Sequence, residues 1–128
     1  MNRKALLAFA KEQYGTEPEY PWVRFPAFAV LRHPENRKCY AFIMNVPRAK
    51  LALPGEDEAD IVNVKCGAAA AGLYRSMPGI LPAWHMRTDA WVSVLLDGTV
   101  PREEVETLLE RSFDLTAQRI LPRRTKKE

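Results

Sequence analysis

Three polar residues in the middle of the sequence could together bind a small anion. Asn63 and Lys65 lie in the stretch VNVKC, and His85 lies in PAWHM. An amide, a lysine and an imidazole can all donate hydrogen bonds to a negatively charged oxygen. If their segments are neighbouring strands, the three side chains form a polar pocket for a phosphate or another small anion, or for a protein partner. The alternative is that His85 makes only a structural hydrogen bond.

A second group of residues has the chemistry needed to contact nucleic acid. Lysine and arginine side chains bind phosphates, and an exposed indole can stack on an unpaired base. The candidates lie near a predicted hairpin, beside a short Ala-rich segment and within PAWHMR; they are Arg32, Arg37, Lys38, Lys65, Arg75, Trp84 and Arg87. The competing interpretation is that the hairpin charges only protect an exposed sheet edge and that the tryptophans belong to the core.

Recognised catalytic and metal-binding motifs are absent from the sequence. It contains no nucleophile elbow, no phosphate-binding loop and no dinucleotide-binding glycine pattern. We therefore expect no catalytic activity and no cofactor. Four side chains could bind a metal by residue type, but their spacing matches no zinc module, and we expect no metal site. They are His33, Cys39, Cys66 and His85.

Length, composition and charge predict one soluble domain with a basic end. The chain has 128 residues, of which 47% are hydrophobic and 27% charged, as is usual for a globular domain. No apolar run approaches the roughly 20 residues needed to cross a bilayer. We expect a cytoplasmic monomer with a domain over residues 1–121. The net charge of +3 arises from the last ten residues, so residues 122–128 form a basic tail on a nearly neutral body.

The spacing of hydrophobic residues predicts the elements that must position these candidates. Leu6, Phe9, Ala10 and Tyr14 mark a first helix, which Asn2 can begin and Gly15 can end. The stretches FAVLRH and CYAFIMNV predict an antiparallel hairpin, and IVNVKC predicts a further strand. A short strand at residues 50–53 is also expected.

The second half of the chain adds two helices and the last strands. GAAAAGLYRSM predicts a short helix, and AWVSVLL predicts a strand, with a helical turn from residue 88 as the alternative. Asp97 and Gly98 form a turn, and a long final helix begins near Pro101. This order indicates an α+β protein in which an antiparallel sheet is covered on one face by the N- and C-terminal helices.

Several of these stretches resemble the MmcQ/YjbR family when they are taken together. The resemblance rests on VNVKC, a short helix, GILPAWHM, and then WVSVLLDGTVPREEVETLLERSFDL. It implies a CyaY-like, frataxin-like α/β sandwich of the double-wing type. It also implies non-catalytic DNA binding through the phosphate backbone and duplex shape rather than through base sequence. The sequence departs from the family pattern at Gly67-Ala68 and at Ala90, where the family has Asp-Pro and a second histidine.

Overall fold

The structure is a computed structural model that describes residues 1–86 and 89–117. Within these residues the chain forms three α-helices, one 3₁₀ helix and five strands. In chain order they are α1 (Arg3–Tyr14), β1 (Ala29–Arg32), β2 (Cys39–Pro47), η1 (Arg48–Leu51), β3 (Glu58–Lys65), α2 (Ala68–Tyr74), β4 (Ile80–Pro82), β5 (Trp91–Leu95) and α3 (Arg102–Thr116).

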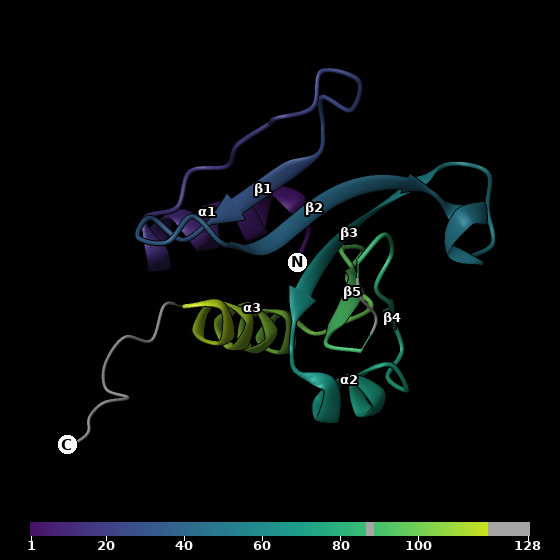
Figure 1. The fold of residues 1–128 in the computed structure, drawn as a ribbon. Helices are drawn as coiled ribbons and strands as arrows, with labels where there is room; N and C mark the ends of the chain where they lie inside the picture. The colour runs from purple at the N-terminus through teal and green to yellow at the C-terminus, as the bar shows by residue number, and fades with distance from the viewer. Residues whose placement is uncertain (87–88, 118–128) are drawn as a thin grey trace.

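The five strands form one antiparallel sheet in the order β1-β2-β3-β5-β4. The three helices lie against one face of this sheet, as the ribbon indicates (Figure 1). The α+β class and the antiparallel sheet covered by helices are therefore confirmed. The likeness to the frataxin fold stays a prediction.

Successive side chains of the strands point to opposite faces of the sheet, and each face carries its own apolar cluster. Val62, Val64, Val92 and Val94 point toward the helices and belong to the main core. A second, smaller cluster covers the opposite face and is formed by Met44, Val46, Ala59, Ile61 and Leu95, with half-buried aromatic and leucine side chains around them. Because successive side chains of a strand point to opposite faces, Asn63 faces this second side, away from the helices.

The first helix begins and ends as its sequence predicts. The Asn2 side chain accepts a hydrogen bond from the backbone N–H of Ala5 at 2.9 Å, and Gly15 ends the helix with a φ of 66°. We expect Asn2→Ala to lower the free energy of unfolding by about 1 kcal/mol, because the capped N–H group loses its acceptor. Urea denaturation followed by circular dichroism measures this change, and an unchanged midpoint would mean that water replaces the cap.

The structure differs from the sequence expectations at one short segment. Residues 48–51 form the 3₁₀ helix η1 in place of the predicted short strand at residues 50–53. The strand prediction for AWVSVLL is correct, since β5 begins at Trp91. Val92, Val94 and Leu95 are buried there, whereas Trp91 is half-buried.

The turn before the last helix forms as predicted. Gly98 has a φ of 91°, and the Asp97 carboxylate accepts a hydrogen bond from the backbone N–H of Thr99 at 2.9 Å. The hydrogen bond from the Thr99 side chain lowers the pKa of the Asp97 carboxyl. A carboxyl whose pKa is lowered by folding stabilises the fold at neutral pH, and this contribution is lost as the pH falls through its folded pKa.

A buried serine of α3 bridges two strands where their own pairing stops. The ladder between β2 and β3 ends with Ala41 opposite Val64. One residue further on, the backbone N–H of Lys65 donates to Ser112 Oγ at 2.9 Å, and Ser112 Oγ donates to the carbonyl of Tyr40. The hydroxyl thus takes the place of a direct bond between the strands, and β3 diverges from β2 at this point (Figure 1).

Candidate functional site

A buried polar network holds the loop after β4 against the second face of the sheet. Asn63 on β3 and Ser93 on β5 lie opposite each other, and both are fully buried. Asn63 Nδ2 donates to the carbonyl of Trp84 at 2.8 Å, Ser93 Oγ donates to Asn63 Oδ1, and the N–H of Trp84 donates to Ser93 Oγ at 2.9 Å. The two side chains therefore fix both polar groups of the Trp84 backbone.

His85, the residue that follows Trp84, has a strained backbone. His85 has a φ of 60°, in the left-handed region that non-glycine residues seldom adopt. Its side chain is exposed, and its ring contacts the indole of Trp84 with 3.8 Å between centroids. Strained conformations persist where the surroundings impose them, and they concentrate at functional sites. The Asn63–Ser93 network holds both backbone groups of Trp84, the residue directly before His85.

An aromatic wall from the other half of the chain faces the Trp84–His85 loop. Trp22 stacks on Phe42 of β2 with 5.1 Å between ring centroids, and Phe25 stacks on Phe28 with 4.7 Å. The segment that carries these rings is held at its ends, because Glu19 bridges to Val30 and Arg3 of α1 donates to the carbonyl of Ala27. Trp22 and Phe25 nevertheless remain 39% and 51% exposed.

Together the wall and the loop enclose an open cavity, which we call the aromatic cleft. Its volume is about 470 Å³, and it is lined by Arg24, Phe25, Pro26, Ala27, Phe28, Asn45, Pro47, Lys50, Glu58, Trp84 and His85. A smaller apolar hollow between Trp22, Phe42 and Met44 adjoins it and shares Phe25, Phe28 and His85. Clefts of a few hundred Å³ with apolar walls and a few polar groups are typical ligand sites.

The predicted pocket of Asn63, Lys65 and His85 does not form as one cavity. Asn63 is buried with both ends of its amide engaged, so it supports the Trp84–His85 loop and is not free to bind an anion. The Lys65 side chain lines a separate hollow beside Asp89, Ala90 and Trp91. The expectation was therefore wrong in its geometry, because neighbouring positions on one strand face can still be separated by a packed loop. Only His85 reaches the cleft.

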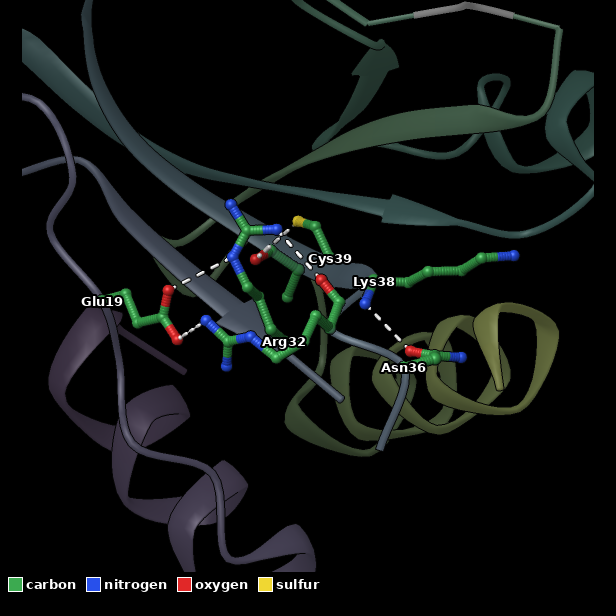
Figure 2. A network of polar contacts seen from close by, with 7 residues as sticks. Glu19, Arg32, Asn36, Lys38 and Cys39 are labelled. Atoms are coloured by element: carbon green, nitrogen blue, oxygen red, sulfur yellow. Dashed lines mark hydrogen bonds and ion pairs between the residues drawn. The ribbon is translucent and has the colours of Figure 1, made fainter. Parts of the chain in front are cut away.

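The predicted nucleic-acid residues of the hairpin are partly engaged in ion pairs. Arg32 and Arg37 both contact the carboxylate of Glu19, with Arg32 Nε 3.2 Å from it. Figure 2 shows Glu19 between the two guanidinium groups, with the Lys38 side chain pointing away from this network. These ion pairs hold the pKa of the Glu19 carboxyl below its usual value. Two of the three predicted phosphate ligands thus already have an acidic partner.

The remaining candidates are distributed over the molecule. Arg75 ends α2, and Lys65 ends β3. Trp84 lines the aromatic cleft on the face of the sheet opposite the helices, whereas Arg87 lies outside the described residues, as does the expected domain end at residue 121 with its basic tail. The six described candidates are therefore divided among the β1–β2 hairpin, the end of β3, the C-cap of α2 and the aromatic cleft.

The residues considered as metal ligands have other roles. His33 Nε2 contacts the carbonyl of Phe113 at 2.8 Å and Thr116 Oγ1 at 3.0 Å, which joins the β1–β2 hairpin to the end of α3. In residues 1–86 and 89–117, no group of three or more His, Cys, Asp or Glu side chains could hold a metal ion. The helices of the same residues include none that is long and apolar enough to cross a membrane.

Both cysteines are free thiols whose pKa values are raised by burial. Burial raises the pKa of the Cys39 thiol to about 11, and it also raises the pKa of the Cys66 thiol. Because the thiolate is the reactive form, we expect both to react slowly with Ellman's reagent at pH 8 and completely in denaturant. Fast release of one equivalent of chromophore from the folded protein would contradict this prediction.

The cleft residues that sequence reasoning missed lie in the connector between the first helix and the first strand. The stretch YPWVRFPAF supplies Phe25 and Phe28 to the cleft and Trp22 to the adjoining apolar hollow. Its sequence signal was the density of aromatic residues between prolines, which is unusual for a solvated loop. Phe42 belongs to a predicted strand, and its side chain lies on the face of the sheet that the helices leave open.

The chain is a small α+β protein with an aromatic cleft beside the sheet face opposite its helices. The YjbR family model matches residues 11–115. A protein of Bacillus subtilis (strain 168), described as the uncharacterized protein YyaQ, is 43% identical over 116 residues, which are 91% of this chain and 98% of that one. The chain therefore belongs to the YjbR family.

Solved structures agree with this assignment. A crystal structure of a Pseudomonas syringae protein superposes with a TM-score of 0.90 at 39% identity, and it covers 91% of this chain and 100% of its own. A Deinococcus radiodurans protein, DR2400, superposes with a TM-score of 0.67 at 22% identity, over 89% of this chain and 77% of its own. The second likeness concerns the fold alone.

Proposed function

We propose that this protein is a non-catalytic binding protein whose aromatic cleft holds one nucleotide unit. The unit is either a free nucleotide or an unpaired nucleotide of single-stranded DNA or RNA. The observation that supports this proposal best is the combination of exposed rings and free cations around one cavity. Phe25, Trp84 and His85 offer flat surfaces there, and Arg24 and Lys50 line the same space.

The rings of the cleft suit the flat, weakly polar face of a base. Stacking between a base and an aromatic side chain contributes about 1–3 kcal/mol and tolerates any base. The polar rim suits the phosphate, because Arg24 and Lys50 are exposed and make no ion pair with another described residue. The pairing of Arg32 and Arg37 with Glu19 favours this site over backbone binding along the hairpin.

Fluorescence titration of the full chain tests the proposal. Trp22 and Trp84 lie in or beside the cleft, so a bound base is expected to quench their emission. Nucleoside monophosphates, short single-stranded oligonucleotides and duplex DNA are titrated at several salt concentrations. Quenching by monophosphates indicates a free nucleotide as the ligand, and quenching by oligonucleotides alone indicates a strand. A site with two cations predicts a shallow salt dependence.

A pair of matched variants shows whether binding uses the cleft. We expect Phe25→Ala to weaken binding about tenfold or more, because one stacking surface is lost. Leu73→Ala is the control, since Leu73 is an exposed apolar residue of α2, outside the cleft. Binding of duplex DNA alone, with equal affinity in both variants, would overturn the proposal and favour phosphate-backbone binding elsewhere on the protein.

A further inference from the structure

We infer that the aromatic cleft takes a single strand of nucleic acid, and that consecutive nucleotides of this strand fill the cleft and a second hollow beside it. The inference rests on the proposed function, because it decides between the free nucleotide and the strand as the ligand of the same site. The second hollow has a volume of about 330 Å³ and shares Lys50, Trp84 and His85 with the cleft. We call it the β4 hollow.

The β4 hollow lies between the 3₁₀ helix η1 and the strand β4. Its lining residues that are not shared with the cleft are Leu51, Ala52, Leu81, Pro82 and Ala83. Leu81 is opposite Ser93 in the sheet, and Leu51, Leu81 and Trp84 pack against the smaller apolar cluster. The β4 hollow is therefore on the face of the sheet that the helices leave open.

Trp84 and His85 stand between the cleft and the β4 hollow. Both residues line both spaces, and their rings contact each other with 3.8 Å between centroids. Their position is supported from below, because Asn63 and Ser93 hold the Trp84 backbone. A free nucleotide has one base and fills one of the two spaces at a time. A strand can place one base in each and so uses both.

The lining of the β4 hollow suits a second base. Most of its lining is apolar, and no acidic residue of the described chain belongs to it. Pro82 is exposed, so its ring offers a flat apolar surface in the same hollow as Trp84. Bases pack on flat apolar and aromatic surfaces with little dependence on their identity. We therefore expect the strand to be bound without strong preference for its sequence.

The charges around the two spaces favour a strand of nucleotides over a peptide. Lys50 lines both, so the phosphate that joins two nucleotides lies within reach of its side chain. Arg24 lines the cleft, and neither cation makes an ion pair with another described residue. Glu58 is the one carboxylate among the described residues that lines either space. Each nucleotide of a strand brings one phosphate, whereas an extended peptide has an uncharged backbone.

Calorimetric titration of the full chain with thymidine ligands of increasing length tests the inference from the ligand side. The ligands are dTMP, the 5′-phosphorylated dinucleotide pdTpdT and the corresponding tetranucleotide, with pUpU in parallel to separate RNA from DNA. We expect a dinucleotide to bind at least about tenfold more tightly than dTMP, because a second base is buried. This factor exceeds the gain of about twofold that two equivalent units give by statistics alone. The tetranucleotide is expected to add little more.

The titration separates the failure of this inference from the failure of the proposed function. Equal affinities of dTMP and both dinucleotides would overturn the strand as the ligand and leave the proposed function intact. Absence of binding by every nucleotide and oligonucleotide would overturn both. Tighter binding of tetraglutamate than of either dinucleotide would assign the two spaces to an acidic peptide and would also overturn the inference.

Pro82→Glu tests the inference from the protein side, because it places a carboxylate in the β4 hollow and leaves the lining of the cleft unchanged. We expect the affinity for pdTpdT to fall about tenfold, while the affinity for dTMP stays within about twofold. Pro34→Glu is the matched control, since Pro34 is exposed in the β1–β2 turn and lines neither space. Ala52→Glu repeats the test from the η1 side of the hollow. Unchanged affinity for pdTpdT in both hollow variants would contradict the second binding position.

Discussion

Replacing Asn63 with alanine is expected to lower the free energy of unfolding by about 2–4 kcal/mol and also to weaken the proposed nucleotide binding at least about tenfold. The carbonyl of Trp84 and the hydroxyl of Ser93 would lose their partners in a fully buried site. A buried polar group left without a hydrogen bond costs about 1–3 kcal/mol, and this network has two such groups. Urea denaturation measures the stability, and fluorescence titration measures the binding.

Asn63 does not line the cleft, so its effect on binding is indirect. It acts by positioning the loop that carries Trp84 and His85. Without the Asn63 amide, the Trp84 backbone keeps its N–H bond to Ser93 but loses the hydrogen bond to its carbonyl, directly before the left-handed residue His85. We expect the measured dissociation constant to rise at least about tenfold under conditions in which the variant is folded. A destabilised variant with unchanged affinity would show that the loop does not depend on this anchor.

Replacing Ser112 with alanine is expected to lower the free energy of unfolding by about 2–3 kcal/mol with no change in nucleotide affinity. The hydroxyl is fully buried and connects the N–H of Lys65 to the carbonyl of Tyr40. Its removal leaves two backbone groups unsatisfied at the point where β3 diverges from β2. Thermal and urea unfolding of the variant measure the effect.

Ser112→Ala is also the stability-matched control for Asn63→Ala. Ser112 belongs to α3, on the helix-covered face of the sheet, whereas the cleft lies on the other face. Ser76→Ala is the control for removing a serine hydroxyl at an exposed position. We expect it to change the free energy of unfolding by no more than about 0.5 kcal/mol, because Ser76 is exposed. A small loss for Ser112→Ala, similar to that of Ser76→Ala, would mean that β2 and β3 close up and pair directly.

The class of fold could be predicted because its determinants are local in the sequence. Asn2 and Gly15 bound the first helix, the strands show their alternation, and Asp97-Gly98 turns the chain into α3. Each of these signals depends on the few residues beside it. The resemblance to the MmcQ/YjbR family, carried by the stretch from Ile61 to Leu115, pointed to the same assignment.

The aromatic cleft could not be predicted in the same way, because sheet order and register create it. Trp22 and Phe25 meet Trp84 and His85 only after β2, β3 and β5 have paired and left one face without helices. Register also decided that Asn63 points inward as a support, while Lys65 lines a different hollow. The sequence by itself therefore determined the elements and their caps. The tertiary structure alone decided which side chains share a cavity, because contacts between distant residues depend on how the strands pair.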